Sequence, residues 1–139
     1  MNNEATIAYF SMEIGLSNDI PTYSGGLGVL AGDTIKSSAD LEIPIVAVTL
    51  LSKKGYFSQD IDNEGRQVEY AVDWDPARFM IRLPKKVKVQ IEGRNVYLQP
   101  WCYKVRSATG GEVDVLCLDT AVEEDTNEDR AITAAWDLG

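Results

Sequence analysis

The chain has 139 residues, of which 45% are hydrophobic and 25% charged, a composition typical of a folded globular domain. A chain of this length can bury a core without disulfides or structural metals. The 13 basic and 22 acidic residues give a net charge of −9, which argues against nucleic acid or an anionic membrane as a partner. The absence of histidine excludes Ser-His-Asp triads and the commonest zinc sites, so we expect no metal site.

The termini and apolar segments predict a cytoplasmic protein. Residues 1–4 lack the basic start and apolar run of a signal peptide. The longest apolar stretch, residues 43–51, contains Pro44 and is too short to span a bilayer. In the cytoplasm, we expect Cys102 and Cys117 to remain reduced.

The first third of the chain predicts a βαβ unit with a glycine-rich loop, residues 1–52. Residues 7–12 are apolar on both faces, as in a strand buried within a parallel sheet. Residues 14–28 contain Pro21 and four glycines and predict a loop. A helix is then expected to end before Pro44, with a second buried strand over 43–51. The apolar stripe of that helix consists of Leu27, Leu30, Ala31, Ile35, Ala39 and Leu41.

Residues 53–122 predict an antiparallel β meander, because apolar and polar residues alternate there. The expected strands cover 79–83, 87–91, 96–106 and 113–118. Residues 78–111 hold 8 basic residues and 1 acidic residue, counted from the sequence. We interpret Lys85, Lys86 and Lys88 as a solvated strand face, with an anion-facing surface as the alternative.

The register of the last hairpin predicts how the two cysteines lie relative to each other. If its turn is centred between Thr109 and Gly110, Cys102 lies directly opposite Cys117. Two packed thiols are favoured over a disulfide because the cytosol is reducing.

Residues 123–139 predict an acidic loop followed by a C-terminal helix. Thr126 and Asp129 have the spacing of a capping box. The helix is expected to include residues 131–136 and to stop at Gly139.

The loop formed by Gly25, Gly26, Leu27 and Gly28 lies between the first strand and the helix. Glycines let a ligand approach the backbone closely, and free amides at a helix N-terminus favour phosphate or another anion. The spacing is neither G-x-G-x-x-G nor that of a P-loop. A tight turn with glycines for close packing is therefore an equal alternative.

These glycines, preceded by Ser11-Met12-Glu13, resemble the opening of the α-glucan phosphorylases. The resemblance continues in the same order along nearly the whole chain, at residues 55–59, 73–74, 101–106, 118–120 and 128–133. It implies an α/β fold, namely a partial Rossmann-like N-terminal domain of a two-domain, GT-B type glycosyltransferase. The βαβ unit, the meander and the C-terminal helix would all belong to that domain.

The resemblance also implies an activity, the transfer of a glucosyl unit from an α-1,4-glucan to inorganic phosphate to give glucose 1-phosphate. Gly25, Gly26, Leu27 and Gly28 would bind phosphate and the glucosyl unit, with no catalytic side chain in this segment. Glu13 would lie near the site, where holding the loop backbone is the favoured role. The family's cofactor, pyridoxal phosphate, is held by a lysine of the C-terminal domain, which is expected to be absent here. The chain is thus expected to be an N-terminal portion that is inactive alone.

The sequence departs from the family pattern at some positions, and there are alternatives to the phosphorylase interpretation. Ile14 and Gly15 replace aromatic residues of many family members, one of which stacks on the cofactor. Glycogen and starch synthases share a K-x-G-G-L-G-D motif, but here Tyr23 and Val29 replace its lysine and aspartate. Two further alternatives are a non-catalytic glucan- or phosphate-binding module and a relic that pairs with a full-length relative. Self-association, or pairing with the missing C-terminal part, is expected because a truncated sheet exposes apolar surface.

Overall fold

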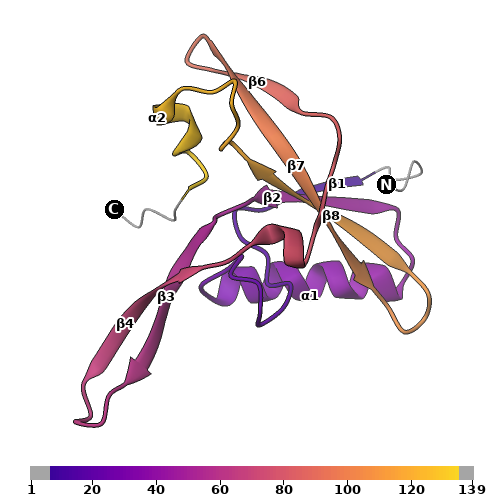
Figure 1. The fold of residues 1–139 in the computed structure, drawn as a ribbon. Helices are drawn as coiled ribbons and strands as arrows, with labels where there is room; N and C mark the ends of the chain where they lie inside the picture. The colour runs from indigo at the N-terminus through magenta and orange to yellow at the C-terminus, as the bar shows by residue number, and fades with distance from the viewer. Residues whose placement is uncertain (1–6, 135–139) are drawn as a thin grey trace.

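A computed structural model describes residues 7–134, without the side chains of 54–59 and 71–73. Figure 1 shows a mixed sheet with one long helix beside it and a hairpin that extends away from it. The elements in chain order are β1 (Ile7–Phe10), α1 (Gly26–Asp40), β2 (Ile45–Leu50), β3 (Lys54–Ile61), β4 (Gln67–Asp73), the short 3-10 helix η1 (Pro76–Arg78), β5 (Ile81–Arg82), β6 (Val87–Ile91), β7 (Arg94–Arg106), β8 (Glu112–Asp119) and α2 (Asn127–Arg130).

The expected βαβ unit is present, and of the expected meander β6, β7 and β8 are consecutive antiparallel neighbours in the same sheet. Its strand order is β1-β2-β8-β7-β5, and β6 pairs with β7 outside this path. β2 pairs in parallel with β1 and with β8, whereas β7 is antiparallel to β5, β6 and β8. The α/β class is therefore confirmed.

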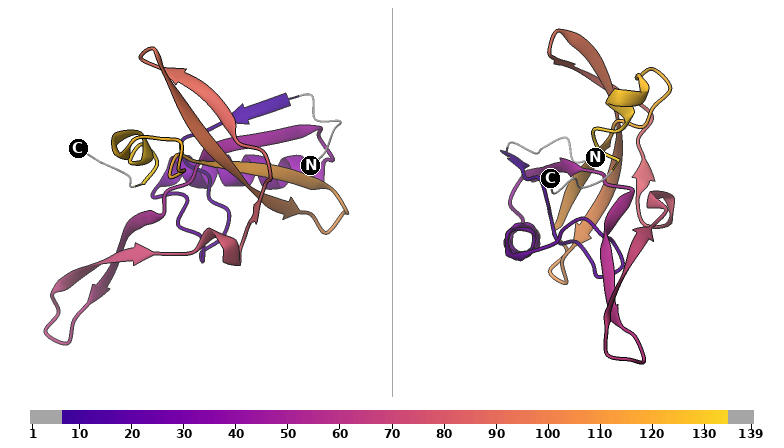
Figure 2. Two further views of the ribbon diagram at one scale, coloured as in Figure 1. Left: turned by 45° about the horizontal axis from the view of Figure 1, so that its top comes forward. Right: turned by 90° about the vertical axis from the view of Figure 1, so that its left-hand side faces the viewer.

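The individual strands β3 and β4 were not predicted, because within the expected meander of residues 53–122 the sequence indicated strands only from residue 79 onward. They form a separate two-stranded antiparallel sheet, and both views in Figure 2 show it extending away from the body. Its turn is held by Asp62, whose carboxylate accepts hydrogen bonds from Glu64 N and Arg66 N, each at 2.9 Å. These bonds, with that of Arg66 N the strongest, lower the pKa of Asp62 below its usual range.

Helix α1 is confirmed, but its buried face differs from the expected stripe. Leu27, Leu30 and Leu41 are 74%, 63% and 72% exposed. The buried positions are instead mostly small, namely Gly28, Ala31, Gly32, Ile35, Ser38 and Ala39. The reason is the close approach of the chain at Gly15, since a Cβ on Gly32 would lie 2.1 Å from the Gly15 carbonyl oxygen. The expected stripe was therefore wrong at its leucines.

Strand β1 is present but not buried on both faces as predicted. It is an edge strand of the sheet, and Phe10 is 74% exposed. Figure 2 (right) shows α1 end-on at one side of the sheet. Within residues 7–134, α1 therefore covers only one face of the parallel strands.

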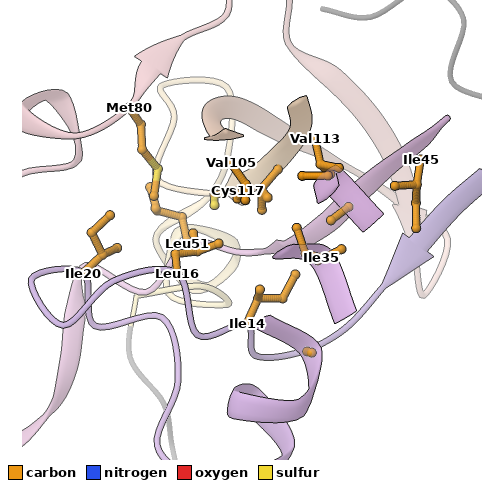
Figure 3. Close-up of a cluster of buried hydrophobic side chains, with 14 residues drawn as sticks. Ile14, Leu16, Ile20, Ile35, Ile45, Leu51, Met80, Val105, Val113 and Cys117 are labelled. Carbon is orange, nitrogen blue, oxygen red and sulfur yellow. The ribbon is translucent and has the colours of Figure 1, made fainter. Parts of the chain in front are cut away.

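The core lies between α1 and the sheet (Figure 3). Ile35 of α1 meets side chains from the parallel strands, and the loop after β1 adds Ile14, which is completely buried. The other fully buried members from strands or their ends are Ala47, Leu51, Val115 and Cys117. The core therefore includes the loop that leads into α1.

The predicted pairing of the two cysteines is wrong by one residue. Trp101 lies opposite Cys117, and Cys102 lies opposite Leu116, so the thiols point to opposite faces. The hairpin closes through Ser107 N donating to the Gly111 carbonyl at 2.8 Å, and Gly110 has φ 96°. The loop between these residues is therefore odd in length, whereas the prediction assumed an even one.

Both cysteines are free and buried, as expected. Burial raises the pKa of both thiols, that of Cys117 to about 12. We predict that a thiol reagent at pH 8 reacts slowly with the native chain and titrates two thiols after denaturation without reductant. Cys117→Ser should leave one thiol in the denatured titration. Finding no thiol in the denatured wild-type chain would instead show a disulfide.

The C-terminal segment is only partly as predicted. Asp129 N donates to Thr126 Oγ1 at 3.2 Å, so this cap is confirmed, but it opens α2, which ends at Arg130. Residues 131–134 form turns and not the expected helix, and 135–139 lie outside the described residues. Arg94 on β7 holds the segment through a 2.7 Å ion pair with Asp129, which lowers the pKa of that buried carboxyl. This ion pair ties the segment to β7, so α2 does not need a long apolar face.

Candidate functional site

The candidate site is the glycine-rich loop at the start of α1. The chain leaves β1, anchors Ile14 and Ile20 in the core, and returns to the helix. Thr22 closes this return, because its Oγ1 donates to the Ile14 carbonyl at 2.5 Å and its carbonyl accepts from Ile14 N at 3.2 Å. Ile14, at a position where aromatic residues were expected in the family, is thus a core residue.

Glu13 contacts the loop directly. Its Oε2 accepts a hydrogen bond from the backbone N of Ser24 at 2.8 Å, eleven residues away in the sequence. This contact is the one expected if Glu13 holds the loop backbone. The carboxylate thereby fixes the residue that immediately precedes Gly25.

Gly28 is required by packing. A Cβ at this position would lie 2.3 Å from the Cβ of Tyr23 and 3.0 Å from Glu13 Oε2. The Gly28 carbonyl also accepts a hydrogen bond from Gly15 N at 2.8 Å. Gly15, Gly28 and Gly32 therefore let two backbone segments touch, which is the close-packing role considered as the alternative above.

Gly25 and Gly26 differ from these packed glycines. A Cβ on either would meet no atom of the chain within 4 Å, and both residues are exposed. Among the described residues, the N–H groups of Gly25, Gly26 and Leu27 have no acceptor, whereas Gly28 N and Val29 N already bond to the Gly25 carbonyl. The loop thus presents unpaired amides at the positive end of a 15-residue helix, which is the geometry that binds anions.

A small polar pocket of about 120 Å³ lies beside the loop. It is lined by the loop after β1 and by α1, with Asn18, Tyr23, Asp33 and Lys36 among its side chains. Among the described residues, no group of three histidine, cysteine, aspartate or glutamate side chains is placed to hold a metal.

The ion pair between Lys53 and Asp119 was not predicted. Lys53 Nζ lies 2.9 Å from Asp119 Oδ2, and the Asp119 side chain is 5% exposed. Asp119 ends β8 and Lys53 follows β2, so both lie at the carboxyl ends of neighbouring parallel strands. A parallel pairing of 43–51 with 113–118 would have indicated this contact, but the sequence pattern placed those strands in separate units.

The chain is similar to known proteins over most of its length, including 93% of it in one case. No family model matches the chain. It is 40% identical to maltodextrin phosphorylase of Thermococcus litoralis over 136 residues, covering 93% of the chain and 16% of that protein. It is 39% identical to glycogen phosphorylase of Mycobacterium tuberculosis over 134 residues, covering 91% of the chain and 15% of that protein. The resemblance to the α-glucan phosphorylases is confirmed.

Glycogen phosphorylase of Aquifex aeolicus is also similar, with 32% identity over 137 residues, which cover 92% of the chain and 19% of that protein. The chain thus spans less than a fifth of the length of these phosphorylases. The names of these relatives favour a phosphorylase over the synthase alternative. Within residues 7–134, no helix combines the length and the apolar character needed to cross a bilayer.

Proposed function

We propose that the chain forms part of an α-glucan phosphorylase, with its glycine loop as half of the phosphate and glucosyl site. The observation that carries this proposal is the row of unpaired amides at Gly25, Gly26 and Leu27, with open space around the first two. Sequence similarity to maltodextrin and glycogen phosphorylases supports it independently. In this proposal the protein acts in the cytoplasm and moves a glucosyl unit from an α-1,4-glucan to inorganic phosphate.

The loop would act through charge and shape. Preorganised N–H donors stabilise negative charge on phosphate oxygens, and the helix dipole adds to this effect. Glu13 would act as a positioning residue, because it holds Ser24 N and thereby the approach to Gly25. Such donors act most strongly where water is excluded, and Gly25 and Gly26 are exposed in this chain. The proposed site is therefore completed by further polypeptide.

Pyridoxal phosphate is the cofactor of the proposed full-length enzyme, where its phosphate takes part in proton transfer. The described residues fit only one part of such a centre. The loop offers amides to an anion, but Lys53 is paired with Asp119 and Lys36 lines the small polar pocket. Neither lysine is proposed to hold the cofactor, whose lysine would lie outside this chain.

A chimera tests the proposal. Residues 1–139 would replace the matching segment of Thermococcus litoralis maltodextrin phosphorylase, and phosphate-dependent release of glucose 1-phosphate would be measured. We expect activity in the chimera, and a loss of about tenfold or more in Gly26→Ala, because the added methyl group enters the space left for the ligand. The melting temperature should not fall, because no atom of the chain lies near that methyl group.

Ser37→Ala, on an exposed position of the same helix, is the matched control and should keep full activity. Full activity of Gly26→Ala would contradict the proposed role of the loop. The isolated chain is expected to release no glucose 1-phosphate. Binding of maltooligosaccharides by the isolated chain would instead favour the binding-module alternative.

A further inference from the structure

The small polar pocket beside the glycine loop has walls that the fold holds in place. One wall is the loop after β1, which Leu16 and Ile20 anchor in the core. The N–H of Gly15 donates to the Gly28 carbonyl at 2.8 Å and so ties this wall to α1. The ring of Tyr23 lies against Gly15, because a Cβ on that glycine would be 3.4 Å from Tyr23 Cδ1. The pocket is therefore preformed, as ligand sites in proteins usually are.

The side chains around this pocket offer polar groups that the chain itself does not use. They are the amide of Asn18, the phenol of Tyr23, the carboxylate of Asp33 and the ammonium of Lys36. Within the part of the chain that the structure describes, none of these four side chains has a hydrogen-bond or ion-pair partner. Asp33 and Lys36 are neighbours on one side of α1, three residues apart, and still do not pair with each other. Both charges therefore remain available to a ligand.

The balance of charge around the pocket selects the class of ligand. Asp33 repels an anion and Lys36 repels a cation. A hydroxyl group both donates and accepts a hydrogen bond, so one molecule with several hydroxyls can bond to a carboxylate and an ammonium together. Val29 and the ring of Tyr23 supply apolar contact for the C–H groups of such a molecule. The chemistry of the pocket therefore fits a neutral polyol.

The size of the pocket limits the polyol to a small one. The volume is about 120 Å³, whereas sites for drug-sized ligands measure about 300–1,000 Å³. A water molecule takes up about 30 Å³ in the liquid, so a ligand that fills the pocket replaces only a few waters. One sugar ring enters such a pocket by an edge, and a longer stretch of glucan does not fit inside.

We propose that the small polar pocket binds a single hexose unit, at a site separate from the amides of Gly25 and Gly26. The choice of a hexose among polyols rests on the proposed function, because glucosyl units are what a phosphorylase transfers. The unit is a free monosaccharide or the end residue of an α-1,4-glucan, which present the same kind of hydroxyl groups. Asp33 accepts hydrogen bonds from these hydroxyls, and Asn18 and Lys36 donate hydrogen bonds to them.

A glucose titration of the isolated chain tests this inference, with the chemical shifts of backbone amides as the measurement. We expect weak, saturable changes at residues 15–18 and 33–36 and little change at residues 25–26. Asp33→Asn should weaken glucose binding by about tenfold or more, because hydrogen bonds to a charged group are the stronger ones. The melting temperature of this variant should stay within about 2 °C of the wild type, because Asp33 has no partner to lose among the described residues.

Ser37→Ala is the matched control, because Ser37 is exposed on the same helix and does not line the pocket. It should bind glucose as the wild type does. Gly26→Ala should also keep glucose binding, and inorganic phosphate should not displace the sugar, because the pocket and the loop are separate. Unchanged shifts at the pocket, equal binding by wild type and Asp33→Asn, or displacement of glucose by phosphate would each overturn the inference.

Maltotriose distinguishes the two sources of the hexose unit. Binding of glucose without binding of maltotriose would support the inference with a free monosaccharide as the ligand. Equal binding of both would support it with the end residue of a glucan, and would favour the binding-module alternative for the function. An inactive Thermococcus litoralis chimera, together with the expected glucose shifts in the isolated chain, would refute the proposed function and leave the pocket supported.

Discussion

Gly32→Ala is expected to destabilise the chain by about 2 kcal/mol, although alanine favours helices. The new Cβ would lie 2.1 Å from the carbonyl oxygen of Gly15, and backbone cannot rotate away as a side chain can. Replacing glycine by alanine inside a helix raises stability by about 1 kcal/mol. Overpacking a core lowers stability by about 1–3 kcal/mol, and the cost at Gly32 is expected at the upper end of that range. Urea denaturation followed by circular dichroism measures the difference.

Gly26→Ala is the matched control for this prediction in the isolated chain. It lies in the same helix but has no neighbouring atom within 4 Å of the added carbon. It should leave stability unchanged or raise it by up to about 1 kcal/mol. Equal effects of the two substitutions would show that α1 does not approach Gly15 as closely as described.

Lys104→Met is expected to cost about 3 kcal/mol, because it removes the cation from a buried carboxylate. Lys104 Nζ lies 2.8 Å from Asp114 Oδ1, and the Asp114 side chain is only 3% exposed. Methionine keeps most of the apolar part of the lysine side chain, so the decrease in stability measures the effect of removing the charge. Lys88→Met is the control, because Lys88 is exposed on β6 and has no ion pair among the described residues. A similar small effect of both substitutions would contradict the prediction.

The same ion pair predicts a dependence on alkaline pH. The hydrogen bond to Asp114 raises the pKa of Lys104 in the folded chain above its ordinary value. A raised lysine pKa contributes stability that is fully present below the unfolded pKa of about 10.4 and is lost as the pH rises through the folded pKa. Melting temperatures measured from pH 7 to 11 should therefore fall more steeply for the wild-type chain than for Lys104→Met.

Local patterns were sufficient for most elements of the fold. Apolar runs predicted β1 and β2, alternation predicted β6 to β8, and the glycines with Pro44 bounded α1. The cap at Thr126 followed from spacing alone. These features depend on residues close together in the sequence, so the sequence carries their signal directly.

The candidate site was predictable as a segment but not in its parts. The motif indicated Gly25, Gly26, Leu27 and Gly28 together. Only the structure shows that Gly25 and Gly26 have free space around them, whereas Gly28 is tightly packed. That separation depends on Tyr23 and on the distant Glu13, whose contacts no local pattern encodes. The ion pair of Lys53 with Asp119 was missed for the same reason.

The sequence by itself determined the α/β class, the order of the main strands and helix α1, and the likeness to phosphorylases, because hydrophobic periodicity and motif spacing are local properties. The tertiary structure alone decided which residues are buried. It paired β2 with β8, left β1 at the edge, shifted Cys102 from Cys117 by one residue and turned the leucines of α1 outward. The physical reason is that burial and register depend on which backbones approach each other, as at Gly15 and Gly32, and that approach joins residues far apart in the chain.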